Sequence, residues 1–135
     1  IYVPELIVYH HRRAGLKKHL KQIGNYGLHR GFFAKVFPET SRKFMYFVPS
    51  FFDVFLLGGL MISMIFPNML ELYLFGIAIY LVAIAISTVL IWNKTKNFSV
   101  SLATIPYIIL THIWYGIRFI QGFVFTKKLN SKLGK

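Results

Sequence analysis

Three long hydrophobic blocks occupy the chain from residue 44 onward, and their length predicts helices that cross a membrane. The blocks cover approximately Phe44–Phe66, Met69–Trp92 and Phe98–Phe125. Each reaches or exceeds the ~20 apolar residues that a helix needs to cross ~30 Å of hydrocarbon. Pro67-Asn68 predicts a tight turn after the first block, and the polar residues 93–97 predict a loop after the second. We therefore expect a three-helix transmembrane domain over residues 39–126.

The residues before these blocks predict a short strand. Tyr2–Tyr9 is rich in β-favouring residues, and Pro4 near its start is typical of an edge strand. One strand is not stable alone, so we expect its partner strands upstream, with residues 1–13 forming the end of their sheet. The chain begins with Ile1 rather than Met, which also indicates that it starts inside a longer sequence.

A basic helix is predicted between the strand and the first block, over residues 14–38. A row at helical spacing carries the pattern: Leu16, Leu20, Ile23, Tyr26, Arg30, Phe33 and Phe37. The lysines fall largely off this row, and a basic amphipathic helix ahead of a membrane span is expected to lie in the headgroup plane. Three glycines weaken the helix, so a break into two helices is an alternative. Pro38 ends it.

Lys and Arg set the expected orientation. Of the 16, nine precede Phe44, none lies in the Pro67-Asn68 turn, and two lie in the second loop. The positive-inside rule then places the N-terminal side of this multi-pass protein in the cytoplasm. Three crossings leave the basic tail, residues 127–135, outside, which conflicts with the same rule. Either the early charge bias dominates, or the third block, which contains Pro106, is re-entrant or lies partly in the interface.

The net charge narrows the range of partners. It is +12, with 4 Asp and Glu against 16 Lys and Arg, and 56% of the residues are hydrophobic. Excess positive charge favours nucleic acid, anionic lipid headgroups or phosphorylated substrates. Because the basic stretch is joined to membrane segments, we expect a bilayer with anionic headgroups and no nucleic acid. There is no Cys, so the sequence contains no disulfide framework.

Polar residues inside the hydrophobic blocks are the first candidates for function. They are Asp53, His112 and Arg118. An ionisable group within the membrane is costly unless it is paired, so Asp53 is either functional or part of a structural pair with Arg42, Lys43 or a missing domain. Arg118 either extends to the outer headgroups or binds a lipid phosphate.

A second group of candidates lies at the strand–helix junction. His10 and His11 follow the strand, and successive strand residues point to opposite faces, so at most one faces a shared site. An imidazole there suits a metal or a phosphate. Arg12 and Arg13 carry forked donors that suit a diphosphate, and headgroup binding is the alternative.

The junction resembles the end of the catalytic domain in membrane-anchored family 2 glycosyltransferases of the GT-A type. The matching residues are Val8-Tyr9-His10-His11-Arg12-Arg13, Leu16-Lys17-Lys18, Gln22, Tyr26-Gly27 and Arg30. His112, Tyr115-Gly116, Phe119 and Gly122 resemble a His-x-x-Tyr-Gly pattern late in such proteins. The resemblance covers the whole chain, and its most specific part runs from His10 to Arg30.

The resemblance implies a transferase that moves a sugar from a nucleotide-sugar donor to a lipid-linked or polysaccharide acceptor at the cytoplasmic face. It implies an upstream GT-A domain and a divalent metal, Mg²⁺ or Mn²⁺. His10, or alternatively His11, matches the histidine that completes the metal site. Arg12, Arg13, Arg30 and Gln22 become candidates for contact with the donor or a lipid phosphate.

This chain departs from the family in its acids, which are Glu5, Glu39, Asp53 and Glu71. No two of them are close in sequence, and the Asp-x-Asp motif and the catalytic carboxylate are missing. The fragment alone therefore has no catalytic residue and binds no cofactor. The alternative function is a non-catalytic helical anchor or assembly subunit that binds anionic lipid. A transporter fragment is disfavoured by the scarcity of intramembrane charge.

Overall fold

The computed structural model describes residues 15–129, which are helical almost throughout and contain no strand. The helices are α1 (Leu16–Val36), α2 (Pro38–Ser41), α3 (Val48–Ile65), α4 (Leu70–Thr95) and α5 (Phe98–Ile120). Three short turns complete them: η1 (Phe44–Tyr46), η2 (Pro67–Met69) and the π-helical η3 (Gln121–Phe125). The strand expected at Tyr2–Tyr9 lies outside the described residues.

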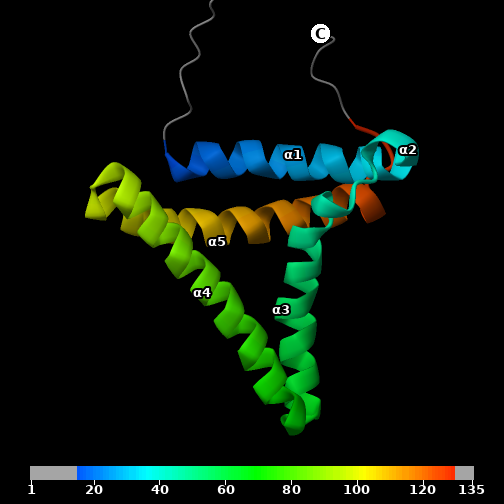
Figure 1. The fold of residues 1–135 in the computed structure, drawn as a ribbon. Helices are drawn as coiled ribbons and strands as arrows, with labels where there is room; N and C mark the ends of the chain where they lie inside the picture. The colour runs from blue at the N-terminus through cyan, green and yellow to red at the C-terminus, as the bar shows by residue number, and fades with distance from the viewer. Residues whose placement is uncertain (1–14, 130–135) are drawn as a thin grey trace, which may run out of the picture.

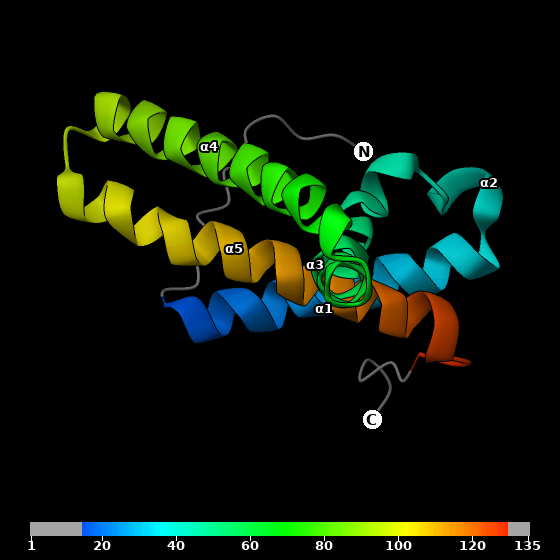
Figure 2. The ribbon, with the colours of Figure 1, turned by 90° about the horizontal axis from the view of Figure 1, so that it is seen from below.

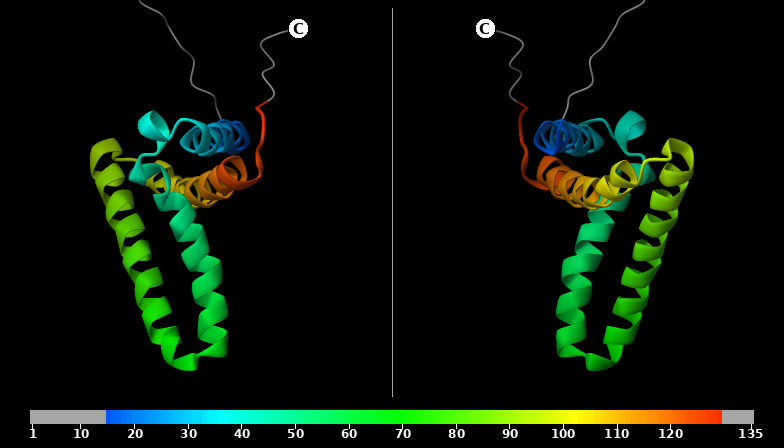
Figure 3. Two further views of the ribbon diagram at one scale, coloured as in Figure 1. Left: turned by 90° about the vertical axis from the view of Figure 1, so that its right-hand side faces the viewer. Right: turned by 90° about the vertical axis from the view of Figure 1, so that its left-hand side faces the viewer.

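The helices form a triangle with a second layer on one side (Figure 1). α1 and α5 lie side by side and run in the same direction, while α3 and α4 leave the α5 side and converge at η2. Figure 2 views α3 nearly end-on, with α1 and α5 crossing the view, so α3 stands roughly perpendicular to both. Figure 3 shows the α3–α4 hairpin projecting away from the α1–α5 layer.

Local signals explain where the long helices begin. Pro49 falls in the first turn of α3, where a missing N–H costs nothing. The Asn97 side chain caps α5 by accepting a hydrogen bond from the Val100 amide at 3.1 Å. Lys96 before it has a φ of 54°, which ends α4 and turns the chain into α5. Pro106 is accommodated inside α5 without ending the helix.

Three segments have the length and apolar composition needed to cross a membrane, as the sequence predicted. They are Val48–Ile65, Pro67–Thr95 and Phe98–Phe125. Most of their side chains face outward: Leu57 is 70% exposed, Phe75 64% and Leu90 62%. Large apolar side chains that cover both α3 and α4 at this exposure are suited to lipid rather than to water.

The closest packing in the described chain joins α1 to α5. Gly24, Gly27, Gly31 and Ala34 are the buried positions of α1. A Cβ on Gly27 would lie 2.6 Å from the Tyr115 carbonyl oxygen, and one on Gly31 would collide with the Phe119 backbone. Phe119 is 1% exposed and lies at the centre of this interface.

The glycines of α1 do not break the helix, which is continuous from Leu16 to Val36, so the alternative of two helices is wrong. The packed face is not centred on the apolar row: Ile23 packs against the core, whereas Tyr26 is 50% exposed and Phe37 55%. Small residues let the two backbones approach, and the resulting contact with α5 offsets the low helix propensity of glycine.

Candidate functional site

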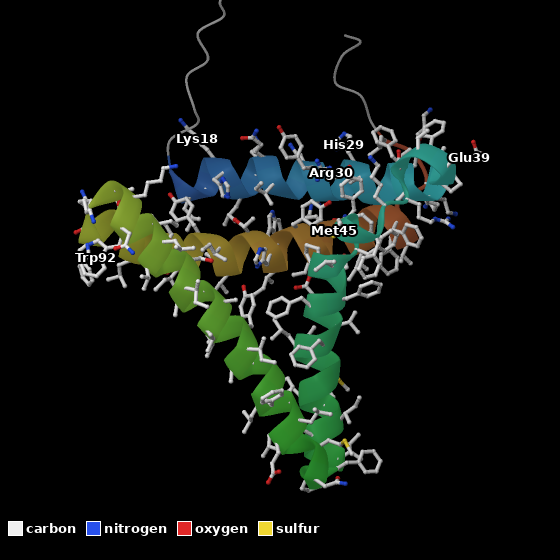
Figure 4. The ribbon with its side chains drawn as sticks, viewed as in Figure 1. Lys18, His29, Arg30, Glu39, Met45 and Trp92 are labelled. Atoms are coloured by element: carbon white, nitrogen blue, oxygen red, sulfur yellow. The ribbon has the colours of Figure 1, made fainter. Side chains whose placement is uncertain are left out.

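Polar groups follow one another at helical spacing along α1. Gln22, Tyr26 and Arg30 are four residues apart, and Tyr26 and Arg30 are exposed. The Gln22 amide nitrogen donates a hydrogen bond to the Tyr26 hydroxyl at 2.9 Å. The Arg30 guanidinium lies over the Tyr46 ring, 4.6 Å from its centroid, which holds the side chain in place. Lys18 and His29 project from the same helix away from α5 (Figure 4).

A buried carboxyl group lies where α3 meets α5. Asp53 is 6% exposed, and neither of its oxygens has a hydrogen-bond partner among the described residues. It lies against the α-carbon of Gly116, where a Cβ would collide with it. Ser50, one turn earlier, donates to the Gly116 carbonyl oxygen at 3.2 Å. The expected partner Arg42 instead donates to the Ala34 carbonyl oxygen at 3.3 Å.

His112 lies on the side of α5 that meets α4. Its Nδ1 is 3.1 Å from the Tyr80 hydroxyl, which is an interhelical hydrogen bond. The adjacent Thr111 hydroxyl is 2.9 Å from Nε2 of His19, which connects α5 to α1. The two imidazoles border an open cavity of about 320 Å³ whose lining is His19, Ile91, Thr104, Tyr107, Ile108, Thr111 and His112. The cavity is therefore mainly apolar, with hydrogen-bonded polar groups along one side.

Arg118 connects α5 to α1. Its Nε donates to the Gly24 carbonyl oxygen at 3.4 Å, and its guanidinium lies 5.9 Å from the Trp114 ring centroid. A second connection follows at the end of α5, where Lys35 donates to the Thr126 carbonyl oxygen at 2.5 Å. Both contacts join α1 to α5 and the segment that follows it, away from the hairpin end.

The structure separates the candidate residues into distinct places. Gln22 and Arg30 lie on α1, Asp53 lies where α3 meets α5, and His112 lies on the side of α5 that meets α4. The junction residues His10, His11, Arg12 and Arg13 are outside the described residues. Across residues 15–129, no three His, Asp or Glu side chains come close enough to hold a metal ion.

Sequence reasoning missed two of the residues that join the helices. His19 and Tyr80 were not singled out, because isolated polar residues on helices give no indication of their distant partners. The glycine face did leave a signal. Gly24, Gly27 and Gly31 recur at intervals of three and four, a pattern that favours close helix contact.

Comparison with known protein families, with characterised proteins and with solved structures finds no match. The class and the function of the protein therefore have to be inferred from the residues of this chain. What the structure itself defines is a helical protein with three segments apolar enough for a membrane and a basic helix packed on one of them.

Proposed function

We propose that this chain is the C-terminal membrane domain of a family 2 glycosyltransferase that acts at the cytoplasmic face of a membrane. The enzyme would transfer a sugar from a nucleotide-sugar donor to a lipid-linked or polysaccharide acceptor. The observation that carries the proposal is the row of Gln22, Tyr26 and Arg30. These three are among the residues that resemble the family, and Tyr26 and Arg30 are exposed, so another domain would have access to them.

Different parts of the chain would have different roles in the enzyme. α1 would seat an upstream GT-A domain on the membrane and hold its donor site close to an acceptor phosphate, which converts a free encounter into a fixed geometry. Arg30, Gln22, Arg12 and Arg13 would contact the donor or lipid phosphate. His10, or alternatively His11, would supply the final ligand to Mg²⁺ or Mn²⁺ bound by the upstream domain.

A non-catalytic anchor that binds anionic lipid is the second candidate. The observation that favours it is the composition of α1, which has five Lys or Arg and no Asp or Glu. Such a helix is attracted to an anionic leaflet whatever it is joined to. This function accounts for α1 and the apolar helices, but not for the His-His-Arg-Arg run of the junction.

The two candidates differ in what precedes the chain. For the transferase, we expect the roughly 200 upstream residues, the size of one domain, to contain an Asp-x-Asp motif within an α/β pattern. An initiator Met directly before Ile1 would exclude it and leave the anchor.

An activity measurement tests the site residues in the full-length protein. We expect nucleotide-sugar hydrolysis to need Mg²⁺ or Mn²⁺ and to fall at least tenfold in His10→Ala. Arg30→Gln should raise the KM for the donor or the acceptor. The control Lys18→Gln removes an α1 cation that contacts no aromatic ring among residues 15–129, and it should leave both constants unchanged. Full turnover in both His10→Ala and His11→Ala would remove the metal role.

A further inference from the structure

α5 is long and apolar enough to cross a membrane, yet it packs along a helix that is not. α1 follows α5 from the His19–Thr111 hydrogen bond, through the Arg118 contact with Gly24, to the Lys35 contact with Thr126. α1 carries five Lys or Arg, spread from Lys17 to Lys35. Charges at this density are too costly to place in hydrocarbon, so α1 stays at the membrane surface. A helix that lies against it in parallel must stay there as well.

The two sides of α5 differ in the way a helix at the lipid boundary requires. One side is covered by α1 and includes the buried Tyr115 and Phe119, followed by Gly122 in η3. The opposite side is apolar and exposed, in the row Leu102, Leu110, Ile117 and Val124. A helix in the interfacial plane buries an apolar face ~5–10 Å into the boundary between headgroups and acyl chains. Here α1 occupies the side that would otherwise face water.

The position of the hairpin agrees with this orientation. α3 and α4 project from the side of α5 that faces away from α1 (Figures 1 and 3). If they cross the bilayer roughly along its normal, α5 lies close to the membrane plane, because α3 stands nearly perpendicular to it (Figure 2). Trp92, at the α5 end of α4 (Figure 4), then falls at the level where aromatic residues are enriched.

The distribution of charge gives an independent argument. All twelve Lys and Arg within residues 15–129 lie on α1, between α1 and α3, at the α4–α5 connection, or on α5 and the segment after it. None lies near η2, where Glu71 is the nearest charged residue. Two crossings place every cation of this segment on one side of the membrane, as the positive-inside rule requires. Three crossings would place Lys127 and Lys128 on the other side.

We propose that α3 and α4 are the only crossings within residues 15–129, and that α5 is a monotopic helix. Its exposed row, Leu102, Leu110, Ile117 and Val124, docks on the acyl–headgroup boundary of an anionic leaflet, beneath α1. The three-span prediction is thereby replaced by a two-span hairpin, and the conflict over the basic tail disappears. This topology holds for a transferase and for an anchor alike.

Cysteine labelling tests the number of crossings directly, because the chain has no Cys of its own. Lys18→Cys, Asn68→Cys and Lys128→Cys each place a thiol at an exposed position. In sealed vesicles of one orientation, a membrane-impermeant maleimide should label Lys18→Cys and Lys128→Cys from the same side. Asn68→Cys should react only from the opposite side. Labelling of Lys128→Cys together with Asn68→Cys would establish a third crossing and overturn the proposal.

A depth measurement provides a second test that does not depend on vesicle orientation. A fluorophore on Leu110→Cys, midway along α5, is compared with one on Leu57→Cys, midway along α3. We expect lipids with a quencher near the headgroup to act more strongly on Leu110→Cys. Lipids with a quencher at the chain end should act more strongly on Leu57→Cys. If both positions respond most to the chain-end quencher, α5 crosses the bilayer and the proposal is wrong.

Discussion

Asp53 is the residue whose surroundings fit its chemistry least well. It lies in the first turns of α3, nearly inaccessible, with no hydrogen-bond partner for either carboxyl oxygen among the described residues. The contact with Gly116 leaves no space for another group on that side. A charge buried in this way raises the free energy of the folded protein, and a carboxyl group retained at such a position needs a reason other than stability.

We expect Asp53→Asn to stabilise the protein, since the amide keeps the volume of the carboxyl group and removes its charge. The gain should be about 1–3 kcal/mol, because a buried charge without a partner costs more than a neutral amide in the same position. Thermal unfolding of the purified protein in detergent measures it. Ser50→Ala is the matched control, and it should lose about 1 kcal/mol with its hydrogen bond to Gly116. Loss of stability in Asp53→Asn would show that the carboxylate has a partner.

Among the helices, the contact between α1 and α5 determines the arrangement of the rest. Gly24, Gly27 and Gly31 give α1 a face without side chains, and the backbone of α5 occupies it. At Gly24 the neighbour is the Trp114 side chain, whereas at Gly31 it is the Phe119 backbone. A side chain can rotate away from a new methyl group, but a helix backbone must move as a whole.

We expect Gly31→Ala to destabilise the α1–α5 contact by about 1–3 kcal/mol, the usual cost of overpacking a close contact. Gly24→Ala should cost less, because Trp114 is able to move. Gly58→Ala is the control, since a Cβ there meets nothing within 4 Å and alanine favours a helix by about 0.5–1 kcal/mol. Thermal unfolding ranks the three variants. Equal effects at positions 31 and 58 would contradict the packing described here.

The elements themselves were largely predictable, and their pairing was not. Block length alone predicted three apolar helices, and the Pro67-Asn68 turn placed the first break between them. The loop predicted over residues 93–97 is shorter, because α4 continues to Thr95 and only Lys96 and Asn97 separate it from α5. The apolar row of α1 did not indicate the packed face, which consists of Gly24, Gly27, Gly31 and Ala34. The hydrophobic pattern of a sequence does not indicate a helix contact that forms because glycine has no side chain. The Tyr80–His112 hydrogen bond was equally hidden, since it joins residues on different helices.

On the scale of the whole molecule, the cations gather at the α1–α5 layer and leave the hairpin end without any in the described segment. Each Lys or Arg near an anionic leaflet contributes about 1 kcal/mol of attraction. α1 exposes several of them on the face away from α5, including Lys18. Anionic lipid should therefore add to the contacts within the protein and hold the α1–α5 layer more firmly than those contacts do alone.

Hydrogen exchange in lipid nanodiscs measures how strongly anionic lipid stabilises the α1–α5 layer. We expect the amides of α1 to exchange more slowly in anionic than in zwitterionic discs. The difference should shrink at about 1 M salt, where the screening length falls to ~3 Å. The amides of α3 and α4 provide the internal control and should exchange alike in both lipids. Protection of α1 that is independent of lipid charge would argue against an electrostatic contact with the leaflet.

The unequal lengths of α3 and α4 have a consequence for the membrane that surrounds them. The 18 residues of α3 extend about 27 Å, and the apolar residues 70–92 of α4 extend about 34 Å. A hydrocarbon layer of ~30 Å fits the first nearly upright and the second only at a tilt of about 30°. Two helices of these lengths fit such a layer when they diverge from η2, as α3 and α4 do, and α5 bridges their separated ends (Figure 1). A thinner bilayer tilts α4 further, so the spread of the hairpin depends on the thickness of the membrane that holds it.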